Sequence, residues 1–221
     1  MTRTLPVQCT SPRIWWWRNL LACVLVLIFP MALAEEDAAG MVARGDQAFK
    51  RGDLIEAIEW YRGAAEKGHP VAQMRYGYIL DRSEDNEAAL AWYRKAAEQG
   101  HAPGQYAIAQ MYATGDGVVR DLAEARRWWK LAAAQDHVDA IVALATESER
   151  GARPAQGSPS EALDYWKRAA QLGDSGAMSR LAQAYRKGEL GLAIDVQKAQ
   201  QWEDKVKAAA SRRATDKKEK P

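Results

Sequence analysis

The sequence is dominated by a short stretch, an aromatic residue followed by paired alanines, that recurs five times. The intervals between successive stretches are 32, 36, 37 and 37 residues, and their first residues are Trp60, Trp92, Trp128, Tyr165 and Trp202. A fixed period in this range is typical of stacked helical pairs, because each pair buries its apolar face only against its neighbours. We therefore expect an all-α chain, an α-solenoid of about five antiparallel helix pairs.

Each aromatic stretch lies within a longer amphipathic segment with apolar residues at helical spacing, which we interpret as the second helix of a pair. A residue suited to cap a helix N-terminus precedes each segment: Asp53, Asp85, Asp121, Ser158 and Asp195. The first helices are expected near small or apolar residues that precede each aromatic stretch: Met41, Ala72, Gly104, Ala140 and Ala177.

The leading aromatic of each stretch is predicted to lie in the core, because the alanines four residues later make room for it. The aromatics that directly follow are expected to be half exposed: Tyr61, Tyr93, Trp129 and Trp166. The alternative is a ladder of exposed rings on which a ligand stacks.

The first 34 residues are typical of an export signal. Three arginines precede the apolar run 20–29, and small residues end at Ala34 before an acidic stretch. We predict cleavage after Ala34 and a periplasmic or secreted protein, with a short linker over 35–40. If residues 14–34 are instead retained, the chain is an inner-membrane-anchored scaffold. Both cysteines, Cys9 and Cys23, lie in this segment.

The charge of the chain is nearly balanced. The 31 Lys and Arg side chains face 29 Asp and Glu, and the three arginines before Ala34 disappear if the signal is cleaved. The mature chain then has 28 basic and 29 acidic side chains, and its last 17 residues hold seven basic and two acidic ones. The charged segment 211–221 is predicted to be disordered. A nucleic-acid-binding protein is therefore not indicated.

No set of residues indicates catalysis. His69, His101 and His137 all follow a second helix at the same position of their repeats, where a cation would stabilise the helix dipole. Equivalent positions of neighbouring repeats are too far apart to share one metal ion. The sequence contains neither a G-x-S-x-G motif nor a phosphate-binding glycine loop. We expect no enzyme activity, no metal and no cofactor.

The segment from Gly104 to Gly115, followed by Asp116-Gly117-Val118-Val119-Arg120-Asp121 and then Ala125, Trp128 and Ala132, resembles the Sel-one-like repeat, a relative of the tetratricopeptide repeat. The resemblance covers about residues 41–210. It implies a right-handed superhelix whose first helices line a concave face. It also implies an exported protein that binds another protein, as an adaptor or regulator, or as an immunity protein that neutralises a secreted effector such as a phospholipase. The alternative is a secreted enzyme acting on cell-wall or beta-lactam substrates.

The tetratricopeptide pattern, carried over position by position, places one set of first-helix side chains on the concave face. Their mixture of charged, amide and aromatic groups suits a polypeptide partner. The predicted partner-binding residues are Gln47, Lys50, Arg51, Met74, Tyr78, Asp81, Arg82, Tyr106, Gln110, Val142, Thr146, Glu149, Arg150, Ser179, Gln183, Arg186 and Lys187.

Overall fold

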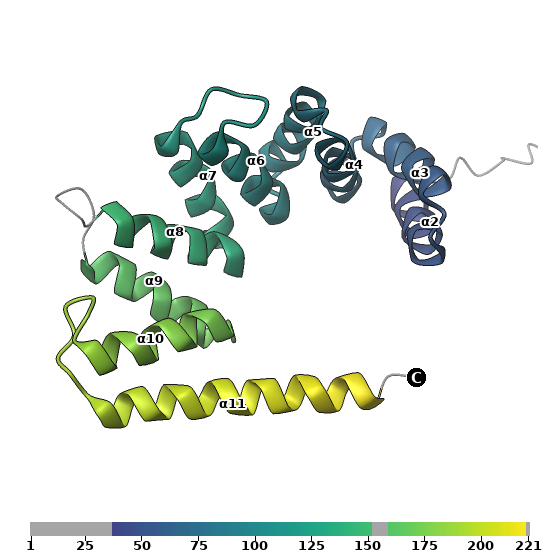
Figure 1. Cartoon of the computed structure of the whole chain (residues 1–221). Coiled ribbons are helices and arrows are strands. Elements are labelled where there is room, and N and C mark those ends of the chain that lie inside the picture. The colour runs from purple at the N-terminus through teal and green to yellow at the C-terminus, as the bar shows by residue number, and fades with distance from the viewer. Residues whose placement is uncertain (1–36, 152–158, 220–221) are drawn as a thin grey trace, which may run out of the picture. The chain divides into compact units, whose positions relative to one another are not determined.

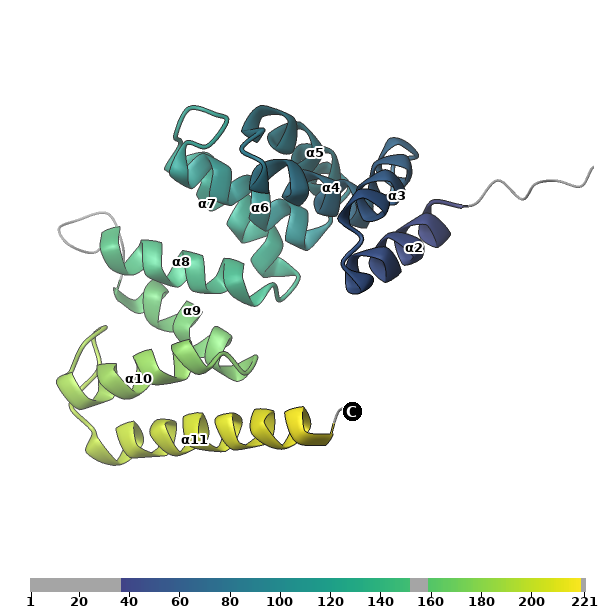
Figure 2. The same cartoon turned by 45° about the vertical axis from the view of Figure 1, so that its right-hand side comes forward.

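The computed structural model describes residues 37–151 and 159–219. These residues form ten helices and no strand, in agreement with the predicted all-α class (Figures 1 and 2). In chain order the helices are α2 (Ala38–Arg51), α3 (Leu54–Glu66), α4 (Pro70–Arg82), α5 (Asn86–Glu98), α6 (Ala102–Thr114), α7 (Leu122–Ala134), α8 (Val138–Gly151), α9 (Pro159–Gln171), α10 (Ser175–Lys187) and α11 (Val196–Glu219).

The helices pack in sequential order. Each helix contacts the next one along the chain, most extensively within the pairs α2–α3, α4–α5, α6–α7, α8–α9 and α10–α11. The first helices α4 and α6 of neighbouring pairs also touch each other. This arrangement confirms the predicted stack of five antiparallel helix pairs.

The aspartates predicted to cap second helices do so. The carboxylate of Asp53 accepts a hydrogen bond from the backbone N–H of Glu56, and that of Asp121 accepts from the N–H groups of Ala123 and Glu124. Asp85 and Asp195 make the equivalent bonds to Ala88 and Lys198. Ser158 lies outside the described residues.

The aromatic residues that fill the core are not the predicted ones. Tyr61, Tyr93, Trp129 and Trp166 are 3, 3, 5 and 8 % exposed, whereas the leading residues Trp60, Trp92, Trp128, Tyr165 and Trp202 are only half-buried. The reason lies on the first helices. A Cβ atom added at Gly45 would lie 2.6 Å from the Tyr61 ring, and one at Gly77 would lie 2.8 Å from the Tyr93 ring. Each tyrosine thus occupies the space that a glycine leaves.

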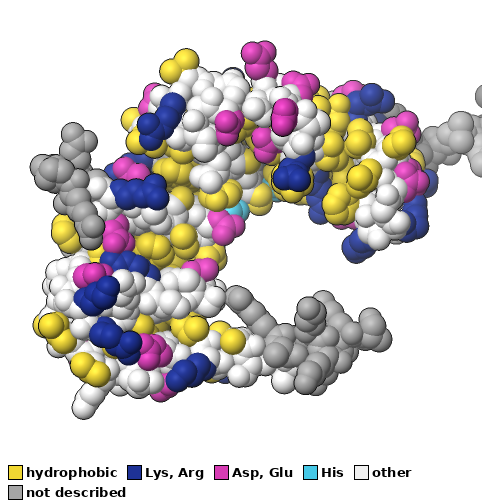
Figure 3. All heavy atoms as spheres, in the orientation of Figure 1, with side chains coloured by type: hydrophobic (Ala, Val, Ile, Leu, Met, Phe, Trp, Pro, Cys, Tyr) yellow, Lys and Arg dark blue, Asp and Glu magenta, His cyan; other side chains and the backbone are white. Residues whose placement is uncertain are grey.

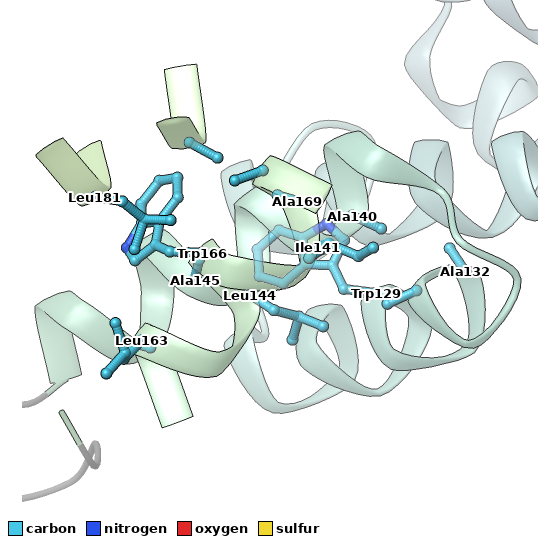
Figure 4. Packing of buried hydrophobic residues seen from close by; sticks show 14 of the residues in the cluster. Trp129, Ala132, Ala140, Ile141, Leu144, Ala145, Leu163, Trp166, Ala169 and Leu181 are labelled. Atoms are coloured by element: carbon cyan, nitrogen blue, oxygen red, sulfur yellow. The ribbon is translucent and has the colours of Figure 1, made fainter. Parts of the chain in front are cut away.

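Alanines let the helices approach closely around these rings. In the last three repeats, Trp129 and Trp166 lie among Ala140, Ile141, Leu144 and other buried apolar side chains (Figure 4). The alanine pairs of α3, α5, α7 and α9 are at most 2 % exposed. The second aromatic residue of each of the first four stretches and the alanine pairs that follow it are therefore core residues, whereas the leading aromatics lie half-buried at the edge of the core.

Two predicted boundaries differ from the structure. The helix α2 begins at Ala38, inside the predicted linker 35–40. The helix α11 continues to Glu219, so the prediction that residues 211–221 are disordered is wrong for most of that segment. The sequence beyond the alanines 208–210 contains no glycine, and its only proline is Pro221, so nothing interrupts the helix.

The predicted signal segment 1–34, with its cysteines and the alternative membrane anchor, lies outside the described residues. Among the helices that the structure describes, none has the length and apolar character needed to cross a membrane.

Candidate functional site

A hollow lies between the first helices α4, α6 and α8. We call it the central hollow, and its volume of about 320 Å³ is at the lower end of the range of ligand pockets. It is lined by Met74, Tyr78, Asp81, Tyr93, Pro103, Tyr106, Ala107, Gln110, Met111, Thr114, Asp116, His137 and Asp139.

Aromatic side chains form much of the wall of the central hollow. The Tyr106 ring stacks on the His137 imidazole with 5.0 Å between ring centroids and 24° between planes. The Tyr93 hydroxyl is directed at the Asp81 carboxylate, 3.5 Å away. Burial raises the pKa of Tyr93, and the negative charge of Asp81 raises it further. Tyr93 therefore stays protonated and donates to Asp81.

The charged lining of the central hollow is acidic. Asp81, Asp116 and Asp139 line it, and no Lys or Arg of the residues that the structure describes does so. The Asp116 carboxylate accepts a hydrogen bond of 2.6 Å from the Thr114 hydroxyl. Burial raises the pKa of Tyr106, and the negative charge of Asp139 adds to this effect. The hollow thus combines aromatic faces with negative charge.

A second depression, the N-terminal groove, lies between α2, α3 and α4. It consists of two adjoining hollows that share Phe49, Tyr78 and Ile79. On its floor the Arg75 guanidinium pairs with the Asp46 carboxylate and donates to the Tyr61 hydroxyl at 3.1 Å. The Tyr61 hydroxyl in turn donates to Asp46 at 2.8 Å. These polar groups are satisfied among themselves.

The upper part of the N-terminal groove is apolar and exposed. Phe49 and Tyr78 are each 51 % exposed, and Leu54 is 56 % exposed. Lys50 and Arg82 line the groove beside them and are exposed. Within residues 37–151 and 159–219, neither of these two cations forms an ion pair. The groove therefore presents apolar surface beside unpaired positive charge.

The first-helix side chains of the fourth and fifth repeats are instead tied to one another. The Arg180 guanidinium pairs with Glu149 at 2.5 Å and with Glu189 at 2.7 Å. The Trp166 indole N–H also donates to Glu149, at 3.1 Å. Both acids raise the pKa of Arg180, mainly through the hydrogen bond with Glu149. Glu149 thus serves the packing between repeats.

A similar ion-pair cluster joins α7, α8 and α9. The Arg126 guanidinium pairs with Glu147 at 2.9 Å and with Glu161 at 2.8 Å. It also donates to the Ser148 hydroxyl at 3.3 Å, and Ser148 is fully buried. This cluster holds three successive helices together.

A third depression, the C-terminal recess, lies between α10 and α11. Its rim carries the ion pair between Arg186 and Glu203, at 2.6 Å. The lining residues are Ser179, Ala182, Gln183, Arg186, Lys187, Glu203, Val206 and Lys207.

The structure brings the predicted partner-binding residues together in three groups. Five line the central hollow: Met74, Tyr78, Asp81, Tyr106 and Gln110. Lys50, Tyr78 and Arg82 line the N-terminal groove, and Ser179, Gln183, Arg186 and Lys187 line the C-terminal recess. The remaining six line none of these depressions: Gln47, Arg51, Val142, Thr146, Glu149 and Arg150.

Several lining residues were missed in the sequence. Phe49 and Arg75 belong to first helices. Each lies within one helical turn of a predicted residue, so the helical pattern could have indicated them. Asp116, His137 and Asp139 lie in a turn or at the start of the next repeat. Asp139 belongs to the next repeat, so its place near Tyr106 depends on how the repeats stack.

The prediction for the histidines is wrong in its physical basis. His69 and His101 are the N-cap residues of α4 and α6, and the His101 Nδ1 accepts a hydrogen bond from the Gly104 N–H at 3.2 Å. An accepting nitrogen carries no proton. Burial lowers the pKa of His101 and of His137, and the neighbouring histidines lower that of His101 further. These two side chains are therefore uncharged helix-start residues. Within the described residues, no group of three or more His, Cys, Asp or Glu is placed to hold a metal ion.

The chain is similar to solved structures of repeat proteins. One, a Sel1 repeat protein from Oxalobacter formigenes, has a TM-score of 0.70 and 31 % identity, covering 78 % of this chain and 73 % of that one. Another, a protective antigen of uropathogenic Escherichia coli with an SLR fold, has a TM-score of 0.67 and 30 % identity, covering 79 % and 39 %. A putative Sel1 repeat protein from Klebsiella pneumoniae shares the fold at a TM-score of 0.54 and 21 % identity, covering 85 % and 94 %.

Sequence comparison gives two curated relatives and a family. Proteins of Rhizobium meliloti and Rhizobium leguminosarum bv. viciae, each named exopolysaccharide production negative regulator, are 30 % identical over 171 residues. These matches cover 72 % of this chain and 52 % of each relative, so the chain spans about half their length. The model of the Sel1 repeat matches residues 37–69, 70–101, 102–137, 138–174 and 175–202. The chain therefore belongs to the Sel1 repeat family, as its helix pairs and the resemblance in its turns predicted.

Proposed function

We propose that this protein is a scaffold without catalytic activity that regulates a partner protein by binding it along the first helices of repeats one to three. The observation that carries the proposal is the central hollow, where five residues predicted to contact a polypeptide converge from two helices. The hollow exposes aromatic and polar groups of the kinds that anchor protein interfaces.

The family supports this general role, because Sel1 repeat proteins bind other proteins. The relatives named as negative regulators of exopolysaccharide production support a regulatory role in particular. We extend that role to this chain as part of the proposal, with an envelope protein as the partner.

The proposal includes export. Residues 1–34 act as the signal, and the mature protein meets its partner in the periplasm or outside the cell. An adaptor binds several partners or binds weakly, whereas an immunity protein binds one secreted effector tightly. Mass spectrometry of the protein from cell fractions tests export: a mature N-terminus at Glu35 supports it, and a retained segment 14–34 in the membrane fraction supports the anchored alternative.

Affinity capture from envelope extract tests the binding site. Wild type is compared with a variant that carries Tyr78→Ala and Tyr106→Ala. The matched control is Tyr185→Ala, which removes a half-buried tyrosine of α10 that lines none of the depressions. The proposal predicts one or more proteins that wild type and the control retain and the double variant loses. If the double variant retains the same proteins, the partner binds elsewhere.

A further inference from the structure

The central hollow and the N-terminal groove are adjacent and have opposite charge. They share the side chain of Tyr78, which lines both and is half exposed. Figure 3 shows hydrophobic side chains next to both acidic and basic ones over the helices of the first three repeats, with a histidine beside an acidic group. One partner segment that passes over Tyr78 would contact both depressions.

The N-terminal groove suits an apolar side chain next to an acidic one. Its exposed apolar side chains, Phe49, Leu54 and Tyr78, line one groove together. Exposed apolar residues that are grouped in this way are typical of interaction sites, whereas single ones are common on any surface. Lys50 and Arg82 border this surface, and they pair with no acid among the described residues. Asp46, the one acid among the described residues that line the groove, is already paired with Arg75 and accepts a hydrogen bond from Tyr61. A carboxylate of the partner would meet unopposed positive charge here.

The central hollow suits a basic side chain. A cation entering it would meet the aromatic faces of Tyr78 and Tyr106, which attract positive charge. It would also meet Asp139, which is exposed and takes part in no ion pair within the described chain. Among the described residues, no Lys or Arg lines the hollow.

We propose that the two depressions are neighbouring subsites for one extended partner segment, which carries an apolar residue and an acidic residue for the N-terminal groove and a Lys or Arg for the central hollow. This inference rests on the proposed function and adds the chemistry of the partner. Charge complementarity on the two sides of Tyr78 fixes the order in which the partner's charges lie along the surface.

Selection from a random 12-residue peptide display library against the full chain tests the proposal. Wild type is expected to enrich peptides that combine an acidic and apolar part with a basic residue. Selection against the variant Lys50→Glu with Arg82→Glu should replace the acidic preference by a basic one and leave the basic residue for the hollow unchanged. Selection against Asp139→Lys should abolish the preference for that basic residue alone. We expect affinity for the wild-type peptides to fall about tenfold with each charge reversal.

Matched controls reverse charge on the second helices. Lys130→Glu in α7 and Asp164→Lys in α9 alter exposed residues that line no depression, and they should leave the selected peptides unchanged. Circular dichroism verifies the fold of each variant. Enriched peptides whose charges do not respond to these reversals, or an absence of enrichment, would overturn the inference. A partner captured from extract that depends on Tyr78 and Tyr106 would still support the proposed function in that case.

Discussion

The first three repeats and the last two stack as helix pairs in the same way but differ on their first helices. Arg75 and Arg180 are each the sixth residue of a first helix, and each pairs with an acid of the preceding repeat. The two acids differ in their position along the first helix. Asp46 is the ninth residue of α2, whereas Glu149 is the twelfth residue of α8, roughly one helical turn further along. Around Asp46 an open groove with exposed Phe49 remains. Glu149 is instead enclosed by Arg180 and Trp166.

This difference shows how one repeat serves two purposes. The open depressions in repeats one to three leave aromatic and charged groups available to a partner. The acids of repeats four and five are instead used in packing: Arg126 of α7 pairs with Glu147 of α8 and Glu161 of α9, and Arg180 of α10 pairs with Glu149 of α8. If this comparison is right, substitutions in the first region alter binding and substitutions in the second alter stability.

The largest effect is expected in the core of the C-terminal region. Trp166→Ala should lower the free energy of unfolding by about 3–5 kcal/mol, because it removes a large ring that is 8 % exposed and leaves a cavity. Urea denaturation measures this change. Trp128→Ala serves as the comparison and should cost clearly less, since Trp128 is half-buried. Equal losses for the two variants would contradict the assignment of the second aromatic to the core.

The next largest effect is expected on binding in the N-terminal region. Tyr78→Ala should weaken partner binding by about 2–3 kcal/mol, as for an aromatic anchor at the centre of an interface. Its unfolding free energy should change by less than about 0.5 kcal/mol, because the side chain is half exposed. Isothermal titration with a selected peptide and urea denaturation measure the two quantities. A variant that loses stability and keeps its affinity would reverse the comparison.

The converse substitution is Arg180→Ala. It removes charged hydrogen bonds to Glu149 and Glu189 and should lower the free energy of unfolding by about 1–3 kcal/mol. Peptide affinity should stay as in wild type. The control Arg186→Ala breaks a more exposed pair with Glu203 and should cost about 0–1 kcal/mol. A loss of affinity in Arg180→Ala would extend the binding surface to the last repeats.

The smallest effect concerns pH. Because the folded protein holds the pKa of His101 and His137 below the ordinary value of about 6.5, the unfolded chain binds more protons. The stability that these side chains contribute is complete above that pH and declines as the pH falls below it. His101→Asn, which keeps a capping acceptor without titrating, should reduce this decline. Thermal unfolding at several pH values between 7.5 and 5 gives the test, and an unchanged pH profile would contradict the uncharged cap.

Much of the fold was predictable because its signals are local. Asp53 and Asp121 mark where second helices begin, and the alanine pairs mark the buried face. The choice between Trp60 and Tyr61 was not local, since both adjoin the alanines. The deciding information is Gly45 on the partner helix, whose missing side chain leaves room for the Tyr61 ring.

The candidate site was predictable only as far as one repeat allows. Tyr78 and Tyr106 follow from their position on first helices, but Asp139 joins the hollow from the first turn of α8, through the stacking of the next repeat, and Asp116 joins it from the turn after α6. Glu149 also lies on a first helix and was predicted to contact the partner, but it forms an ion pair with Arg180. A repeat register tells which side chains face outward, and it does not tell which neighbours pair with them.

Site-specific photo-crosslinking tests the central claim most directly. A photoreactive residue is placed in turn at Tyr78, at Tyr106, at Thr146 of α8 and at Lys130 of α7, and crosslinks to the captured partner or a selected peptide are measured. We predict strong crosslinks from positions 78 and 106 and only background from 146 and 130. Crosslinks confined to 146 or 130 would show that the open face of the first three repeats is not where the partner binds.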